Sequence, residues 1–153
     1  IKLHVIGDID MLPDAAKAEL KDALNETAGN TGLHLIMALS YSSRWEITEA
    51  VKQIANEVKE GNLQPASITQ KTVENYLATK DFPDPELMIR TSGEYRVSNF
   101  LLYQIAYAEL YFTNTLWPDF RKENLYAAIL DFQSRERRFG KTGEQVKDRE
   151  ATG

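Results

Sequence analysis

Two apolar runs of strand length, separated by a helical pattern, limit what this chain can fold into. "IKLHVIGD" (residues 1–8) predicts a buried strand, and "LHLIMALS" (residues 33–40) is an uninterrupted apolar run typical of a parallel strand covered on both faces. The intervening residues 14–27 predict a helix, and turn residues follow them. This order of elements favours an α/β fold built around a mostly parallel sheet that is flanked by helices.

Two amphipathic patterns after residue 40 predict the longest of the remaining helices. After "SYSSR" (residues 40–44), one apolar stripe follows helical spacing on Ile47, Val51, Ile54 and Val58. Gly61 predicts the end of that helix. A last helix is expected from about residue 122 to residue 138, with an apolar face formed by Leu125, Ile129 and Phe132.

Shorter elements fill the middle of the chain. A helix is expected over residues 68–77, followed by a loop. "ELMIR" (residues 86–90) and "LYFT" (residues 110–113) predict two further strands. The apolar run after Ser98 predicts a helix between these strands, which continues the alternation of an α/β fold.

The two ends of the chain carry expectations of their own. A core strand at residue 1, without an initiator methionine, predicts that the chain is the C-terminal portion of a longer protein. Residues 1–139 are expected to belong to one α/β domain that is incomplete at its N-terminus. The polar residues 140–153 are expected to form a mobile tail.

Composition excludes several classes of function. The net charge of -5 argues against broad attraction to nucleic acid, so any phosphate recognition must be local. The absence of cysteine excludes disulfides and cysteine-based zinc sites. His4 and His34 lie in strand-like runs without metal-ligand spacing, which predicts core or edge residues rather than ligands. No apolar stretch reaches the ~20 residues that span a bilayer, and a cytoplasmic location is expected.

One stretch gathers the groups that bind anions. Arg90 and Arg96 offer planar, permanently charged forks, and Gly93 lets the backbone approach a ligand closely. Ser98 adds a hydroxyl and is expected to cap a helix that begins at Asn99, whose first N–H groups would also face an anion. Because this cluster follows a strand, it is expected at the sheet edge where ligands bind. The pattern describes a diphosphate site, and a plain turn before a helix cap is the alternative.

Glu109 follows Ser98 by eleven residues. If one helix joined them, the rise between the two would be about 16 Å, too far for both to hold one ion. Glu109 is therefore either a structural partner for an arginine or a metal ligand in a neighbouring site. A carboxylate near a diphosphate commonly acts through magnesium, which takes oxygen ligands.

These residues lie in a longer stretch that resembles a known family. "DPELMIRTSGEYRVSNFLLYQIAYAELYF" (residues 84–112), followed by "LWPDF", is similar to the signature of the cis-prenyltransferases, and among them the bacterial undecaprenyl diphosphate synthases. "TAGNTGLHLIMALSYSSRWEI" (residues 27–47) and "RERRFG" (residues 135–140) extend the resemblance. It implies a transferase that condenses isopentenyl diphosphate with an allylic diphosphate, usually farnesyl diphosphate. The long polyprenyl product serves in bacteria as the lipid carrier for cell-wall biogenesis.

The resemblance also assigns roles to individual residues. Three of them are implied to bind the diphosphate of isopentenyl diphosphate: Arg90, Arg96 and Ser98. Glu109 falls on the family's magnesium-linked glutamate, which implies Mg²⁺ as cofactor and a place near the interface of a homodimer. Arg138 and Gly140 match the family's C-terminal Arg-x-Gly element, which implies a contribution to substrate binding. Tyr95 stands where some members have histidine, so no metal role is carried over to it.

One family motif does not occur in these 153 residues. The "DGNGRWA"-type motif carries the aspartate that binds the allylic diphosphate through magnesium, so no catalytic residue is assigned here. The full-length protein is expected to be the enzyme, and this portion alone is expected to be inactive. The alternatives are a non-catalytic partner subunit of a heteromeric prenyltransferase and a phosphometabolite-binding domain. The lipid product also implies peripheral contact with the cytoplasmic membrane.

Overall fold

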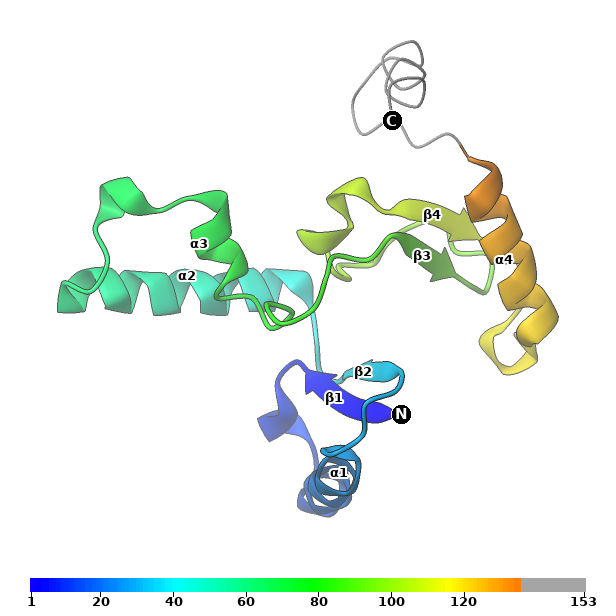
Figure 1. The fold of residues 1–153 in the computed structure, drawn as a ribbon, viewed down its shortest axis with the longest axis horizontal. Helices are drawn as coiled ribbons and strands as arrows, with labels where there is room; N and C mark the ends of the chain where they lie inside the picture. Colours follow the sequence, from blue (N-terminus) through cyan, green and yellow to red (C-terminus); the bar gives the residue numbers. More distant parts are fainter. Residues whose placement is uncertain (136–153) are drawn as a thin grey trace, which may run out of the picture. The chain divides into compact units, whose positions relative to one another are not determined.

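The strands expected from the sequence form two parallel pairs (Figure 1). The computed structural model describes residues 1–135. In it, β1 (Lys2–Ile6) pairs with β2 (His34–Ala38), and β3 (Leu87–Arg90) pairs with β4 (Glu109–Phe112). Helices accompany both pairs, which confirms the α/β class and the parallel pairing.

The chain divides into two compact units. The first unit contains residues 1–83 together with residues 99–102. The second unit contains residues 84–98 together with the chain from residue 103 onward. The short segment 99–102 therefore belongs to a different unit from both of its sequence neighbours.

The first unit begins with the expected strand, helix and strand. α1 (Asp14–Thr27) has the predicted bounds and packs against β1. The hydroxyl of Thr27 accepts a hydrogen bond from the Leu3 N–H at 3.1 Å and so ties the helix end to the strand. After β1 the chain turns at Gly7, whose φ is +110° and where an added Cβ would lie 2.0 Å from the Leu39 carbonyl oxygen. Only glycine fits this approach of two backbones.

α2 (Ser43–Glu60) begins and ends where the sequence indicates. The Ser42 hydroxyl caps it by accepting from the Trp45 N–H, and Gly61 ends it with a left-handed φ of 80°. The predicted stripe is wrong in part, because Val51 is 56% exposed. The buried positions of this helix instead are Ser43, Glu46, Ala50 and Ile54. Two of them are polar, so a search for apolar periodicity cannot find the whole face.

α3 (Gln70–Glu74) is shorter than the expected helix over residues 68–77. Thr69 and Thr72 exchange side-chain and backbone hydrogen bonds at its start, which places the first turn at Gln70. Turns then lead to the loop around Phe82, as the sequence indicates. The ring of Phe82 meets the ring of His4 edge-on, with centroids 4.8 Å apart.

The helix expected after Ser98 does not form. Ser98, Asn99 and Leu101 have positive φ angles of 49°, 61° and 47°, and only a short 3-10 helix, η3 (Gln104–Tyr107), follows. Asn99 lies instead against the start of α2, where its oxygens accept hydrogen bonds from the N–H groups of Ser43 and Arg44. These tertiary hydrogen bonds override the local apolar pattern.

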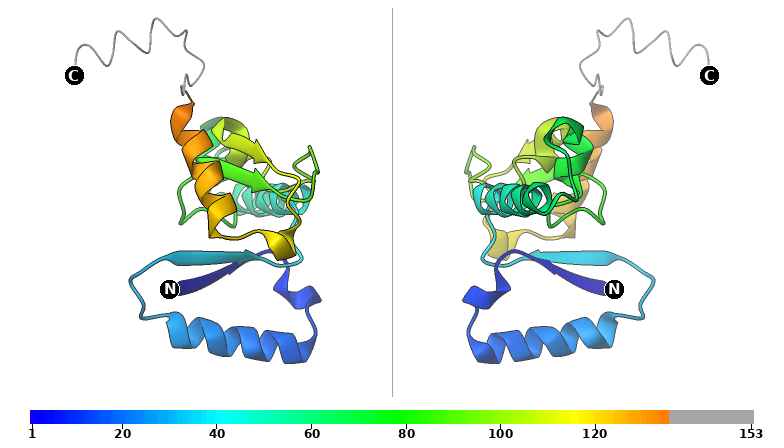
Figure 2. Two further views of the ribbon diagram at one scale, coloured as in Figure 1. Left: turned by 90° about the vertical axis from the view of Figure 1, so that its right-hand side faces the viewer. Right: turned by 90° about the vertical axis from the view of Figure 1, so that its left-hand side faces the viewer.

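In the second unit, α4 (Lys122–Ser134) packs against β4 (Figure 2). A 3-10 turn, η4 (Trp117–Asp119), precedes it, and the Arg121 N–H donates to the Asn124 side-chain oxygen at 2.9 Å at its start. The expected helix is thus present up to Ser134, and residues 136–138 lie outside the described part. The predicted apolar face is wrong for Leu125 and Ile129, which are exposed, whereas the small Ala128 is buried.

β2 is not covered on both faces within residues 1–135. Leu35 and Met37 are exposed, because β2 has only β1 beside it and α1 lies against β1. Among the same residues, no helix combines the length and the apolar character needed to cross a membrane.

Candidate functional site

The residues that the sequence predicts to bind an anion begin at the carboxyl end of β3. Arg90 is the last residue of the strand, and its carbonyl accepts from the Thr113 N–H at 2.9 Å. The N–H groups of Ser92 and Gly93 donate to the Thr115 and Thr113 carbonyls, each at 2.9 Å, so hydrogen bonding continues past the strand. This keeps the following turn in a fixed position beside the end of β4.

The turn itself needs left-handed backbone at two consecutive positions. Ser92 has a φ of 70° and Gly93 a φ of 66°. A Cβ on Gly93 would lie 3.1 Å from the Asn114 side-chain oxygen. The glycine predicted to permit close backbone approach therefore serves a strained turn and a tight contact with Asn114.

Arg96 extends from this turn toward solvent. Its side chain is 68% exposed and forms an ion pair with Glu94, whose carboxylate is less exposed. The Tyr95 ring packs against Phe112 with centroids 5.5 Å apart. Arg96 thus has a neighbouring carboxylate that orients it, while its guanidinium remains accessible to an anion.

Ser98 does not cap a helix. It is exposed, has a φ of 49°, and is followed by the turn of residues 99–102. The expected contribution of a helix N-terminus to the anion site is therefore wrong. Of the groups predicted to bind an anion, the described residues of the second unit retain the guanidinium groups of Arg90 and Arg96 and the Ser98 hydroxyl.

The start of α2, in the first unit, is closed by residues 99–102. The Ser43 N–H donates to the Asn99 carbonyl at 2.8 Å, and the Arg44 N–H donates to the Asn99 side-chain oxygen at 3.0 Å. The buried Ser43 hydroxyl accepts from the Leu102 N–H at 2.6 Å. Two otherwise unpaired helix N–H groups are satisfied in this way, so this helix end is not available to a ligand.

A buried carboxylate lies one turn further along α2. Glu46 is 2% exposed, and its two oxygens accept from the Tyr41 hydroxyl at 2.6 Å and from the Ala78 N–H at 2.9 Å. Burial, followed by the hydrogen bond to Glu46, raises the pKa of Tyr41, so the phenol stays protonated as a donor. This network joins α2 to the segment after α3 and was not foreseen from the sequence.

Glu109 lies at the opposite end of the β3–β4 pair from Arg90. In the parallel register, Leu87 faces Glu109 and Arg90 faces Phe112. Three residues of extended strand correspond to about 10 Å. The separation expected between Ser98 and Glu109 assumed one connecting helix, which does not form. Strand register instead separates Glu109 from Arg90.

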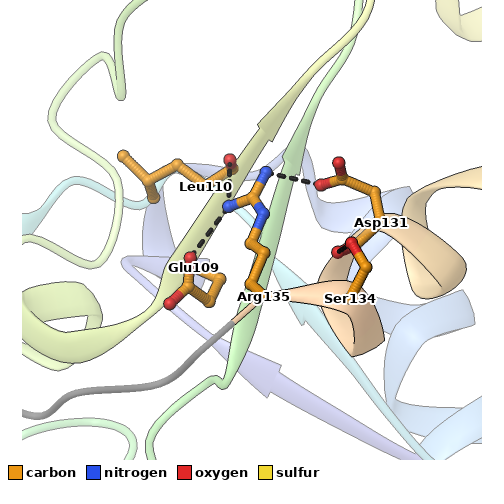
Figure 3. A network of polar contacts seen from close by, with 5 residues as sticks. All are labelled: Glu109, Leu110, Asp131, Ser134 and Arg135. Atoms are coloured by element: carbon orange, nitrogen blue, oxygen red, sulfur yellow. Dashed lines mark hydrogen bonds and ion pairs between the residues drawn. The ribbon is translucent and has the colours of Figure 1, made fainter. Parts of the chain in front are cut away.

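Glu109 has an arginine as partner (Figure 3). The Arg135 Nη1 donates to Glu109 Oε2 at 2.8 Å and to the Leu110 carbonyl at 3.1 Å, and Nη2 donates to Asp131 Oδ2 at 2.5 Å. The hydrogen bond to Glu109, more than any other contact, raises the pKa of Arg135 and keeps it charged. The first of the two alternatives for Glu109, a structural partner for an arginine, is therefore observed.

A complete metal site is not formed by residues 1–135 alone. They contain no group of three or more histidine, aspartate or glutamate side chains placed to hold a metal ion. Glu109 Oε1, the oxygen that Arg135 does not bind, has no hydrogen-bonding partner among these residues. One such oxygen fits a magnesium ion that takes its other ligands from diphosphate and water, and does not fit a cage made of protein ligands only.

Comparison with known proteins adds to this geometry. The prenyltransferase family model described as undecaprenyl diphosphate synthase matches residues 1–140. The chain belongs to this family. It is 53% identical over 150 residues to an isoprenyl transferase of Chlorobaculum tepidum, covering 98% of this chain and 57% of the relative. It is 48% identical over 147 residues to the farnesyl-diphosphate-specific ditrans,polycis-undecaprenyl-diphosphate synthase of Pseudomonas syringae pv. tomato, covering 96% and 59%.

Two solved structures share the fold of this chain. Lavandulyl diphosphate synthase from Lavandula x intermedia, in complex with dimethylallyl diphosphate, superposes with a TM-score of 0.89 at 39% identity, over 92% of this chain and 60% of that one. A probable undecaprenyl diphosphate synthase from Campylobacter jejuni gives a TM-score of 0.76 at 35% identity, over 92% and 63%. The chain thus spans about three fifths of the length of these relatives.

The sequence predicted some of the residues near this site and missed others. Arg138 and Gly140 lie outside the described residues. Arg135 and Asp131 were missed, although their spacing of four residues at the end of a predicted helix is the spacing of a helical ion pair. His4 and His34 stack with ring centroids 4.9 Å apart, and His4 Nε2 lies 2.9 Å from His34 Nδ1.

Proposed function

We propose that the complete gene product condenses isopentenyl diphosphate with farnesyl diphosphate to give a long cis-polyprenyl diphosphate. The observation that carries the proposal is the pair of arginines at the carboxyl end of β3, Arg90 and Arg96, in a chain 48–53% identical to an isoprenyl transferase and a farnesyl-diphosphate-specific synthase. Residues 1–139 would form the C-terminal part of one catalytic domain. The product would serve as a lipid carrier for cell-wall glycans, made in the cytoplasm beside the membrane by a homodimer.

In this proposal, isopentenyl diphosphate binds beyond the carboxyl end of β3. Arg90 and Arg96 bind its diphosphate oxygens through their guanidinium forks, and the Ser98 hydroxyl donates a third hydrogen bond. Glu94 orients Arg96 through their ion pair. Arg138 and Gly140 contribute to binding the same substrates. Fixing the diphosphate orients the attached double bond and lowers the entropic part of the barrier.

The reaction step follows from this placement. The isopentenyl double bond attacks C1 of the allylic substrate, and the bond from C1 to the diphosphate oxygen breaks. A proton then passes from the isopentenyl unit to water, and its C–H electron pair forms the new double bond. The departing diphosphate takes the electron pair of the broken bond, and cationic and N–H donors stabilise its charge. Magnesium, when bound, would neutralise diphosphate charge. Glu109 would hold it through Oε1.

The growing product needs an apolar surface. The exposed side chains of Leu35 and Met37 on β2 support the proposal that this strand lines part of the product tunnel. Apolar surface of this kind is favoured by burial against hydrocarbon at roughly 25 cal/mol per Å². Their exposure within residues 1–135 is then explained by the substrate they would contact.

The test is incorporation of radiolabelled isopentenyl diphosphate by the complete gene product. With farnesyl diphosphate and Mg²⁺, a labelled product of several added isoprene units is expected. Absence of product, in both the presence and the absence of candidate partner subunits, would contradict the proposal. Product formed only with a second, different subunit would indicate the non-catalytic partner instead.

A further inference from the structure

The side chain of Arg135 joins two elements of the second unit. It follows the end of α4, where the chain becomes extended, and its backbone N–H still donates to the Phe132 carbonyl at 3.2 Å. Its Nη1 holds β4 through Glu109 and Leu110, and its Nη2 holds α4 through Asp131 (Figure 3). The guanidinium plane is therefore fixed by three acceptors on two elements.

The charges of this network do not cancel. Two carboxylates, Glu109 and Asp131, share one guanidinium group, which leaves one net negative charge. The three side chains are between 28% and 42% exposed, so water and small ions reach them. Arg135 binds only Oε2 of Glu109, and Oε1 has no partner among residues 1–135.

The arrangement of Glu109 and Arg135 resembles a metal-binding carboxylate whose orientation is fixed by an outer hydrogen-bonding group. Carboxylates that hold metals are themselves commonly fixed by hydrogen bonds from an outer group, which orients the free oxygen. An arginine suits this role, because its planar fork fixes direction, whereas a lysine ammonium does not. The hydrogen bond from Arg135 to Oε2 leaves Oε1 as the oxygen without a hydrogen-bonding partner among residues 1–135.

We propose that Arg135 is a positioning residue that fixes Glu109 so that its Oε1 binds a divalent cation, with Asp131 holding Arg135 in turn. This rests on the proposed function of the complete protein. Metal binding would then depend on Arg135, a residue of the β4–α4 contact. Arg135 is distant in sequence from Arg90 and Arg96. The charge of Arg135 alone is not sufficient for this role.

The decisive variant is Arg135→Lys, which keeps the charge and loses the fork. Binding of Mn²⁺ by the complete gene product, followed by electron paramagnetic resonance of the free ion, should weaken about tenfold. The Mg²⁺ concentration for half-maximal isopentenyl diphosphate incorporation should rise by a similar factor. Asp131→Asn should give a smaller weakening in the same direction, because Arg135 keeps its contacts to β4.

A matched control is Arg121→Lys, at the start of the same helix, where Nη1 donates only to the Phe120 carbonyl. It should leave Mn²⁺ binding within about twofold of wild type. Melting temperatures of all three variants should stay close to wild type, because partly exposed ion pairs contribute little to stability. A fold defect is thereby separated from a loss of positioning.

Two results would overturn the inference. One is unchanged Mn²⁺ affinity in Arg135→Lys. The other is wild-type Mn²⁺ binding that Glu109→Gln does not weaken, which would show that Glu109 is not the ligand. Failure of the proposed function is distinguishable, because it would abolish isopentenyl diphosphate incorporation in the wild type while the dependence of Mn²⁺ binding on Arg135 persisted.

Discussion

The two units each contain a carboxylate, and the two differ in burial and in hydrogen bonding. In the first unit, Glu46 is 2% exposed and both of its oxygens accept hydrogen bonds. In the second unit, Glu109 is 28% exposed, and within residues 1–135 only its Oε2 is bound, by Arg135. A buried carboxylate whose hydrogen bonds are complete holds elements together, whereas an exposed one with an uncommitted oxygen remains free to bind a ligand. Substitutions in the first unit should therefore affect stability, and substitutions in the second should affect binding.

The largest effect is expected for Glu46→Ala. Loss of the carboxylate leaves the Tyr41 hydroxyl and the Ala78 N–H without their acceptor, which should lower the free energy of unfolding by about 3 kcal/mol. Chemical denaturation measures this loss. The control is Glu49→Ala, which removes an exposed carboxylate paired with Lys52 on the same helix and should cost less than about 1 kcal/mol. Equal losses of unfolding free energy in the two variants would contradict the stabilising role of the buried Glu46 network.

A slightly smaller effect, on binding rather than stability, is expected for Arg96→Ala. The Kd for isopentenyl diphosphate should rise about 100-fold, since a charge-assisted pair of hydrogen bonds is lost. Farnesyl diphosphate affinity and melting temperature should change little. Titration calorimetry of each substrate with the complete gene product checks this. Arg96→Lys should also bind weakly, because one ammonium does not replace the fork. Equal weakening toward both substrates would contradict the site.

The turn at Asn99 allows a graded test in the first unit. Asn99→Ala removes the acceptor for the Arg44 N–H and strains a φ of 61°, and should cost about 2 kcal/mol of stability. Asn99→Gly relieves the backbone strain but not the lost cap, so about half that cost is expected. Asn99→Asp keeps both features and should be near wild type in thermal unfolding. A stable alanine variant would show that this hydrogen bond contributes nothing.

The smallest effect is expected from the stacked histidines of the first unit. Desolvation, then the neighbouring His34 and Lys2, lower the pKa of His4. In the folded state, His4 therefore binds a proton less readily than in the unfolded state. The contribution of neutral His4 to stability is complete above about pH 6.5 and is lost as the pH falls through the folded pKa. His34→Gln should flatten the decline of melting temperature between pH 7 and pH 5. An unchanged slope would indicate that other groups cause it.

The sequence was sufficient where local signals decide the structure. The strands at residues 1–8 and 33–40, α1, and the end of α2 at Gly61 follow from apolar patterns and from glycine chemistry. The sequence-based prediction was wrong where a segment's hydrogen-bonding partner is distant in the chain. The turn at Asn99 depends on N–H groups of Ser43 and Arg44, and an apolar run read alone there indicates a helix.

The same distinction applies to the candidate site. Arg90 and Arg96 could be named from residue chemistry, because guanidinium groups and a glycine beside a strand end indicate anion binding. The partner of Glu109 could not, because Arg135 lies 26 residues away and its contact requires α4 to pack on β4. Strand register, which separates Glu109 from Arg90, is likewise invisible until the two strands are paired.

The way residues 99–102 complete the first unit has a practical consequence for dissecting the protein. These residues cap α2, yet they are reached only by passing through residues 84–98 of the second unit. A truncation after Pro83 would remove the cap along with the second unit and expose the N–H groups of Ser43 and Arg44. No single cut in the backbone therefore yields an intact first half, and attempts to express the halves separately should give a frayed α2.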